Sequence, residues 1–382
     1  MFPYSLRYST FYGAFFLTAG ILMPFWPLWL ENRGLDSLQI GLLLALGPWV
    51  RTITNPVIAN ISDRSGKSKK VLMILSILSI CAFLCFFLAQ TFWTILFISI
   101  FAAITFPVML PIAESRVMTS VLNQHLDYGR IRLWGSITFI LGTILTGQLL
   151  DYFNPNLILI LVMAALLITF SSITILPTEK KEKSKYDYKD IPKLLVQPNF
   201  MLFVISASLL QASHAVYNGF SAIHWLSSGI NESVIGLLWA EGVLAEIILF
   251  SLSGFFIARI GPLGLICLAG CVGVIRWVML GLTTDVNYLL LAQVFHAITF
   301  GAVHLGSMHF IARNSPPSLS ATAQGVYASC SGLMMGLTMI LAGSLFENIG
   351  GKSFYAMSAI SALGAVLSIF LILKNKKLTS TL

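Results

Sequence analysis

Charged residues are scarce in this sequence, and their scarcity excludes an ordinary soluble protein. Only 10% of the 382 residues are Asp, Glu, Lys or Arg, whereas 57% are apolar. A soluble domain carries about 25% charged residues, because its surface must face water. A long chain with so little polar surface must face an apolar solvent instead. The sequence therefore predicts a protein embedded in a lipid bilayer.

Motifs of enzymes and metal sites are also lacking. The chain contains no HExxH, no GxSxG, no Walker loop and no Gly-rich dinucleotide motif after a strand. Cys81 and Cys85, like Cys267 and Cys271, are four residues apart within apolar runs, but no His or carboxylate beside them completes a metal site. We expect no enzyme activity, no metal and no cofactor.

Long apolar runs are abundant. About 20 apolar residues cross the hydrocarbon layer as a helix, the structure that satisfies every backbone polar group within one segment. Residues 1–30 lack the basic start and small-residue cleavage site of a signal peptide, so they are predicted to contain the first span. The twelve runs cover approximately 8–30, 38–60, 71–90, 93–115, 131–152, 155–177, 200–227, 234–257, 264–283, 287–311, 321–346 and 353–373. The predicted fold class is an all-α membrane protein with twelve transmembrane helices.

A polar, lysine-rich break after the sixth run divides the chain into two predicted halves. Weak similarity between the loops at Asp63–Gly66 and Ala258–Gly261, each with Arg-x-Gly, suggests that the halves are repeats. The predicted parts are an N-terminal six-helix half, a cytoplasmic linker, a C-terminal six-helix half and a cytoplasmic tail. They cover residues 1–177, 178–198, 199–375 and 376–382, respectively.

The positions of Lys and Arg predict the orientation. With both termini in the cytoplasm, 19 of the 23 basic residues fall on the cytoplasmic side, and only Arg33 and Lys352 fall outside. Arg51 and Arg276 lie within predicted helices. One missed helix would invert the second half and remove this asymmetry, so the distribution supports twelve spans. The basic residues thus indicate topology, and no nucleic-acid partner is expected.

The loop after the second run carries a recognisable motif. It resembles the signature between helices 2 and 3 of the major facilitator superfamily, with Ala59 in place of the usual leading glycine. The resemblance implies a conformational latch, in which basic residues cap neighbouring helices at the cytoplasmic face. The alternative is that these residues only set topology. The latch residues are Asp63, Arg64, Gly66 and Lys67.

Three longer stretches narrow the resemblance. Residues 127–136, 211–221 and 293–305 look like the 3-phenylpropionate transporter family, a branch related to the lactose-permease type of sugar–proton symporter. The similarity covers essentially the whole chain. It implies proton-driven uptake by a multi-pass protein of a bacterial inner membrane, acting as a monomer. It does not determine the substrate.

Glu114 and Arg132 are predicted to contact substrate. A charge at mid-bilayer costs about 2.5–3.5 kcal/mol on insertion scales, so such residues usually face a partner or a water-filled cavity. The lactose-permease branch has a carboxylate and an arginine at this separation, which implies that Glu114 and Arg132 anchor the substrate. A guanidinium can hold a carboxylate with fixed geometry. The alternative is a structural salt bridge, and Arg51 is expected either to pair with Glu114 or to extend outward.

Glu246, Arg276 and His296 are predicted to couple transport to protons. The resemblance implies an acid, an arginine and a histidine on these helices, and movement of Arg276 relative to Glu246 would load or release a proton. Thr299 stands where the lactose permease has a second carboxylate. Glu241 is therefore the reserve coupling acid. The alternative for Glu246 and Arg276 is a buried structural pair.

The remaining candidates are uncharged polar or aromatic. We expect a substrate-lining role, with helix–helix hydrogen bonds as the alternative, for His214, Tyr217, Gln293 and His304. An interfacial aromatic belt, with ring stacking on substrate as the alternative, is expected of Phe25, Trp26, Trp29 and Trp225.

Together these features predict a secondary active transporter. The expected function is proton-coupled symport that imports a small organic solute, either an aromatic carboxylate such as 3-phenylpropionate or a sugar such as lactose. The alternative is proton-driven efflux of a drug or metabolite on the same fold, because a fold does not determine the direction of transport. The expected partners are the small-molecule substrate, protons and the lipid bilayer.

Overall fold

The computed structural model of the chain describes residues 3–124, 126–177, 196–315 and 319–380. All regular structure within these ranges is helical, as predicted. The helices of the first part are α1 (Tyr4–Asn32), α2 (Ser37–Ser65), α3 (Ser68–Cys85), α4 (Phe92–Thr105), α5 (Met109–Gln124), α6 (Tyr128–Leu150) and α7 (Leu157–Thr174). Those of the second part are α9 (Pro198–Ala212), α10 (Ala215–Ser227), α11 (Glu232–Ser251), α12 (Ser253–Ile260), α13 (Pro262–Leu282), α14 (Val286–His296), η2 (Ala297–Ala302), α15 (Val303–Asn314), α16 (Ser320–Ile349), η4 (Gly350–Ser353) and α17 (Phe354–Ser380).

Each of the twelve predicted runs corresponds to one helix or to a short series of helices. By length and composition the described residues contain ten candidate membrane spans, of which Thr322–Lys374 includes both α16 and α17. Some runs are broken. Between α4 and α5 lies Pro107, which has no N–H to donate and clashes with the preceding turn.

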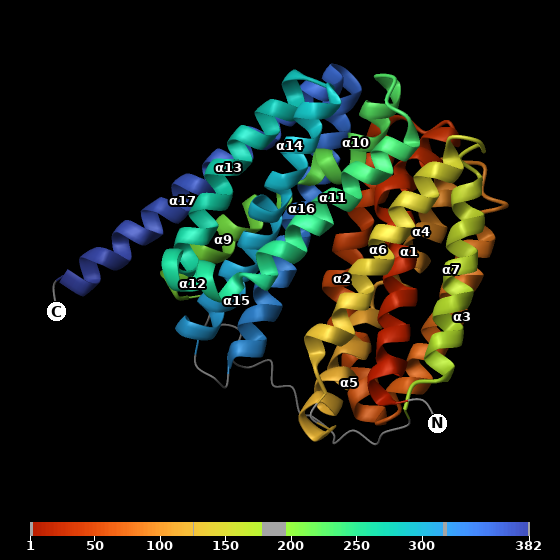
Figure 1. Cartoon of the computed structure of the whole chain (residues 1–382), viewed down its shortest axis with the longest axis horizontal. Coiled ribbons are helices and arrows are strands. Elements are labelled where there is room, and N and C mark those ends of the chain that lie inside the picture. The colour runs from red at the N-terminus through yellow and green to blue at the C-terminus, as the bar shows by residue number, and fades with distance from the viewer. Residues whose placement is uncertain (1–2, 125, 178–195, 316–318, 381–382) are drawn as a thin grey trace. The chain divides into compact units, whose positions relative to one another are not determined.

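The first compact unit contains Met1–Tyr186 together with Trp225–Ala240. Within it α1 packs along α6 and α7 (Figure 1). The backbones of α1 and α6 approach closely at two glycines. A Cβ atom on Gly20 would lie 2.5 Å from the carbonyl oxygen of Phe139, and one on Gly142 would lie 3.0 Å from that of Leu17. Small residues permit such contacts between membrane helices.

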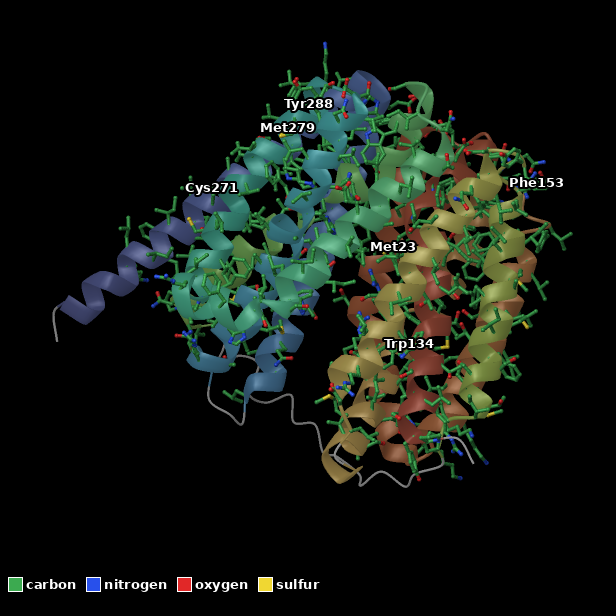
Figure 2. All side chains as sticks on the ribbon, in the orientation of Figure 1. Met23, Trp134, Phe153, Cys271, Met279 and Tyr288 are labelled. Atoms are coloured by element: carbon green, nitrogen blue, oxygen red, sulfur yellow. The ribbon has the colours of Figure 1, made fainter. Side chains whose placement is uncertain are left out.

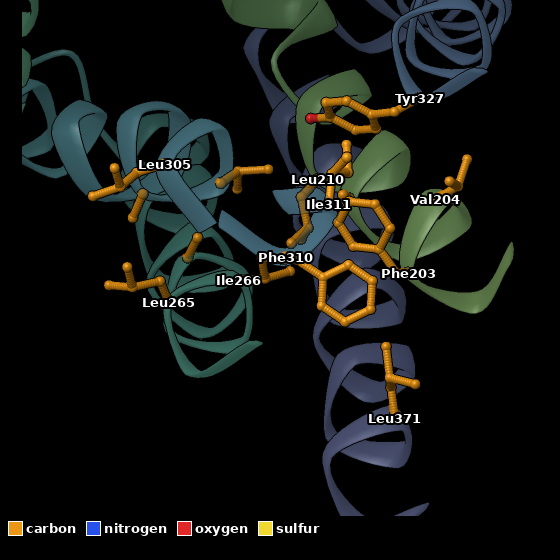
Figure 3. Close-up of a cluster of buried hydrophobic side chains, with 14 of the residues drawn as sticks. Phe203, Val204, Leu210, Leu265, Ile266, Leu305, Phe310, Ile311, Tyr327 and Leu371 are labelled. Carbon is orange, nitrogen blue, oxygen red and sulfur yellow. The ribbon is translucent and has the colours of Figure 1, made fainter. Parts of the chain in front are cut away.

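The second compact unit contains Asp187–His224 and Glu241–Leu382. Here α13 packs along α17, and α9 packs against α16 and α17. Buried rings from three helices fill part of the core: the Phe203 ring lies 4.3 Å from that of Phe310 and 5.7 Å from that of Tyr327 (Figure 3). The unit boundaries group residues 225–240 with helices α1 to α7. The predicted domain boundaries stay a prediction, and residues 178–195 of the predicted linker and 381–382 of the tail lie outside the described residues.

Large apolar side chains point outward from both units. Met23, Trp134, Phe153 and Tyr288 are exposed, and their sticks extend away from the ribbon in Figure 2. Exposed apolar surface on this scale would aggregate in water but is suited to lipid chains. The surface therefore agrees with the scarcity of charge in the sequence.

The predicted aromatic belt is wrong for Phe25, Trp29 and Trp225, which are buried. Trp29 stacks on Trp26 with ring centroids 4.5 Å apart, and Trp26 meets the ring of Phe86, the residue after α3, at 5.0 Å. The cause is packing between helices, which turns these rings into the first unit. A sequence does not show which side of a helix faces a neighbour.

Candidate functional site

A buried arginine organises the polar side chains of the second unit. Arg276 on α13 is 0% exposed. Its Nε donates to the carbonyl oxygen of Ala292 at 2.8 Å, and its Nη1 donates to Thr299 Oγ1 at 2.9 Å and to His296 Nδ1 at 3.2 Å. Its Nη2 donates to Gln293 Oε1 at 3.2 Å. These acceptors are all neutral, and no carboxylate among the described residues forms an ion pair with Arg276.

Two aromatic rings contact the same guanidinium. Its central carbon lies 4.7 Å from the ring centroid of Tyr217 and 4.6 Å from that of Trp277. Cation–π contacts of this kind stabilise a desolvated cation by about 2 kcal/mol. The site therefore holds a positive charge in place with hydrogen bonds and ring faces rather than with a counter-ion.

Gln293 on α14 has a defined amide orientation. Its Oε1 accepts from the Tyr217 hydroxyl at 3.0 Å as well as from Arg276, so the oxygen must face these donors. The side chain is 0% exposed, and no described residue accepts a hydrogen bond from its Nε2. Gly242 on α11 faces the same amide, since a Cβ there would lie 3.4 Å from Oε1. The amide thus presents a buried donor next to Arg276.

A directed chain of hydrogen bonds runs through Thr299. His214 Nδ1 lies 3.2 Å from the carbonyl oxygens of Leu210 and Gln211, so Nδ1 carries the hydrogen and donates. His214 Nε2 must then accept from Thr299 Oγ1, 3.2 Å away, while Thr299 accepts from Arg276. By the same reasoning His296 Nδ1 accepts from Arg276, which requires a neutral ring with its hydrogen on Nε2.

Thr299 lies in the π-helix η2, which follows α14 directly. Single π-turns inside α-helices occur frequently at functional sites. Here the π-turn includes the residue that connects Arg276 to His214. Thr299 appeared in the sequence only as a departure from the related symporters, and no local pattern identified it as the centre of a network.

The two acids of α11 lie close to this network without joining the hydrogen bonds of Arg276. Glu246 packs on η2, where a Cβ on Gly301 would lie 3.4 Å from its Cγ. The alternative of a buried structural pair of Glu246 and Arg276 does not hold, since the two form no ion pair within the described residues. Glu241 interacts electrostatically with Tyr217, and its Oε2 is buried with no donor among the described residues.

His304 on α15 is exposed, whereas His214, Tyr217 and Gln293 are buried. Its ring meets that of Phe250 at 6.2 Å. The structure thus brings three of the four predicted lining residues into one network and places His304 apart from their hydrogen bonds.

In the first unit, Glu114 and Arg132 come near each other through aromatic residues. The Tyr128 hydroxyl donates to Glu114 Oε1 at 3.4 Å, and the Arg132 guanidinium carbon lies 4.0 Å from the ring centroid of Phe16. The two charged groups interact electrostatically. They form no ion pair within the described chain, so the alternative of a structural salt bridge does not hold. Tyr128 and Phe16 were not predicted as site residues.

Two further arginines lie away from Glu114. Arg51 is exposed and its Nε donates to the carbonyl oxygen of Gly47 at 3.2 Å, so it does not pair with Glu114. Arg130 is exposed as well and pairs with Asp127 at 3.3 Å. Neither arginine belongs to the group around Arg132.

The predicted latch is described in part. Gly66 ends α2 in the left-handed conformation with φ 63°, a region that favours glycine, and its N–H donates to the carbonyl oxygen of Ser62. Lys67 is exposed at the start of α3. The side chains of Asp63 and Arg64 lie outside the described part of the structure. The latch itself stays a prediction.

Comparison with known sequences identifies the class of protein. Residues 5–357 match the MFS_1-like family. The chain belongs to this family. This MFS_1-like protein is therefore a multi-pass secondary transporter of the major facilitator type and not an enzyme. The recognition of the superfamily and of the all-helical fold from sequence is confirmed.

Individual relatives carry several substrate names. The "Probable 3-phenylpropionic acid transporter" of Escherichia coli (strain K12) is 31% identical over 364 residues, which are 92% of this chain and 93% of the relative. The maltose permease of Geobacillus stearothermophilus is 22% identical and covers 97% of this chain and 95% of its own. The crystal structure of the nucleoside transporter NupG has a TM-score of 0.84 at 16% identity, over 97% of this chain and 98% of that one. The last similarity concerns the fold alone.

Proposed function

We propose that this transporter is a proton-coupled symporter that imports a small organic solute, with an aromatic carboxylate such as 3-phenylpropionate ranked before a sugar such as lactose. The observation that carries the proposal is Arg276: a fully buried cation that contacts neutral acceptors and, among the described residues, no carboxylate. A buried charge without a counter-ion is costly and is rarely retained for stability alone. Such a cation is suited to an anionic partner that binds and dissociates during transport.

The hydrogen bond between Arg276 and His296 supports the proposal of proton coupling. A second proton on His296 would occupy Nδ1, remove the acceptor and place two positive charges 3.2 Å apart. Arg276 would then have to move toward another acceptor or a carboxylate. Glu246, which packs against η2, is the acid that we assign to this role. Protonation and the position of Arg276 are thereby linked.

The ranking of substrates rests on the two arginines that face aromatic rings. Arg132 lies over Phe16, and Arg276 lies against both Tyr217 and Trp277. A guanidinium beside ring faces is suited to a solute that has both a carboxylate and an aryl group. The name of the Escherichia coli relative agrees with this chemistry. Glu114 and Gln293 would suit hydroxyl groups, which keeps a sugar as the second candidate.

Substitution of Glu246 tests the coupling. We expect Glu246→Gln to abolish accumulation against a gradient and to preserve exchange of labelled for unlabelled solute, because the amide keeps the shape but cannot carry the proton. In vesicles with a pH difference of one unit, wild-type protein should accumulate 3-phenylpropionate about tenfold, and the variant should stop at equilibrium.

The comparison variant is Glu241→Gln on the same helix. It should retain accumulation, since Glu241 lies about 140° around the helix from Glu246. Equal loss of accumulation and exchange in Glu246→Gln, or uncoupling by Glu241→Gln in its place, would show that Glu246 is not the coupling acid.

A further inference from the structure

Three basic side chains of the first unit converge where α7 ends. Lys69 Nζ donates to the carbonyl oxygens of Thr174 at 2.6 Å and Leu176 at 2.7 Å. Arg116 donates from Nη2 to the carbonyl oxygen of Pro177. Lys69 also lies within electrostatic range of both Arg116 and Arg7. Residues from α1, α3 and α5 thus place like charges around one helix end.

This cluster of Arg7, Lys69 and Arg116, termed the basic cluster below, is not neutralised by the protein described here. The carbonyl end of a helix contributes roughly half a negative charge against three positive ones. The ion pair found within the described ranges joins Arg130 and Asp127, and none of the three basic residues forms one there. Capping of α7 therefore explains part of the basic cluster but leaves most of its charge uncompensated.

Unused hydrogen-bond donors accompany this excess charge. Arg116 is 4% exposed, and neither its Nε nor the buried Nε of Arg7 has an acceptor among the described residues. A buried donor without a partner costs about 1–3 kcal/mol, and more when it is charged. Both donors belong to guanidinium groups, which bind phosphate and carboxylate oxygens with two parallel hydrogen bonds.

The position of the basic cluster indicates the source of an anion. Arg7 and Lys69 lie in the first turns of α1 and α3, and the carbonyl acceptors follow the last turn of α7. These three helices are candidate membrane spans, so their ends lie at the level of lipid headgroups. Arg7 and Lys69 are half-buried and remain partly accessible from outside the unit. Figure 1 shows the start of α1 and the end of α7 at the same edge of the first unit.

We propose that the basic cluster binds the phosphate group of an anionic phospholipid. Lys69 and Arg116 fix the end of α7, and the partly accessible guanidinium of Arg7 donates to the phosphate oxygens. The site is separate from the residues assigned to solute and proton transport. Lipid bound here would stabilise the junction of α1, α3, α5 and α7.

The test measures lipid affinity of the purified full-length protein. The protein is exchanged into phosphatidylcholine–detergent micelles and titrated with phosphatidylglycerol, and the unfolding temperature is followed. Wild-type protein should be stabilised in a saturable manner by phosphatidylglycerol. Arg7→Gln should weaken the apparent affinity about fivefold, the effect of one basic residue at an anionic membrane surface. Arg7 is chosen because it makes no hydrogen bond to the end of α7, so the variant keeps the cap.

Lys70→Gln is the matched control. This substitution removes the same charge from an exposed residue next to Lys69. The affinity of the Lys70 variant for phosphatidylglycerol should equal that of wild type. An equal loss in Lys70→Gln would mean general surface attraction and would overturn the proposal. Equal stabilisation by inorganic phosphate at the same concentration would show a site for free anions and would contradict the lipid proposal. The absence of any effect of phosphatidylglycerol on wild-type protein would contradict the proposal as well.

Discussion

Replacing Arg276 by lysine abolishes concentrative uptake. The guanidinium reaches acceptors on Ala292, Gln293, His296 and Thr299 at the same time, which a single ammonium group cannot do. A lysine would keep the charge but could not replace all four hydrogen bonds, and Thr299 and Gln293 are the side chains that would lose the bond from residue 276. Because misplacement of a binding group by 1 Å can cost about 100-fold, we expect the initial uptake rate to fall by roughly that factor. The measurement is uptake of labelled 3-phenylpropionate into membrane vesicles, normalised to the amount of transporter.

The control for this substitution is Arg259→Lys. Arg259 is exposed at the end of α12, and the same change there should leave uptake within about twofold of wild type, as is usual for exposed positions. A monodisperse profile in detergent establishes that the Arg276 variant is folded. Near-normal uptake by a folded Arg276→Lys protein would mean that the charge alone matters and that the geometry around it does not.

Replacing Gly20 by alanine destabilises the first unit. The added Cβ would lie 2.5 Å from the carbonyl oxygen of Phe139, an atom of the α6 backbone that cannot rotate away. The two helices would have to separate, and overpacking of this kind costs about 1–3 kcal/mol. We expect a lower unfolding temperature of the purified protein and a smaller yield from membranes.

Gly47→Ala is the matched control for this prediction. Gly47 lies within α2, and a Cβ there meets no atom within 4 Å. The same substitution should therefore be neutral or slightly stabilising, since alanine favours a helix more than glycine does. Equal unfolding temperatures for the two variants would contradict the close approach of α1 and α6.

The spanning helices could be predicted from the sequence because lipid imposes a simple requirement. A long apolar run must form a helix, and the polar breaks between runs marked the ends of α3, α6 and α13 to within a few residues. Interruptions within the runs were harder to foresee. Pro107 gave a signal for the break between α4 and α5, whereas the π-turn η2 has no comparable marker in the sequence.

The candidate site could be predicted in its residue types but not in its connections. Arg276, His296, Gln293, Tyr217 and His214 were singled out, and the structure joins them in one network. The role of Thr299 depends on how α13, η2 and α9 rotate toward one another. Rotation of helices is set by packing between segments far apart in the chain, which a single sequence does not record.

The same limit applies to the first unit. The loop between α5 and α6 indicated that Glu114 and Arg132 approach each other, but Phe16, which lies against Arg132, comes from α1. Phe16 is 116 positions before Arg132 in the sequence, so no local pattern could indicate this contact. The structure shows no ion pair between Glu114 and Arg132 among the described residues, and their role in binding a solute stays a proposal.

Uptake by purified protein in liposomes tests the central claim most directly. Labelled 3-phenylpropionate is added outside the liposomes, and a pH gradient is imposed with the acidic side outside. The account predicts accumulation above that of protein-free liposomes, into which the protonated acid diffuses unaided, and this excess collapses when a protonophore is added. Uptake that ignores the pH gradient, or accumulation that appears only when the gradient is reversed, would contradict proton-coupled import.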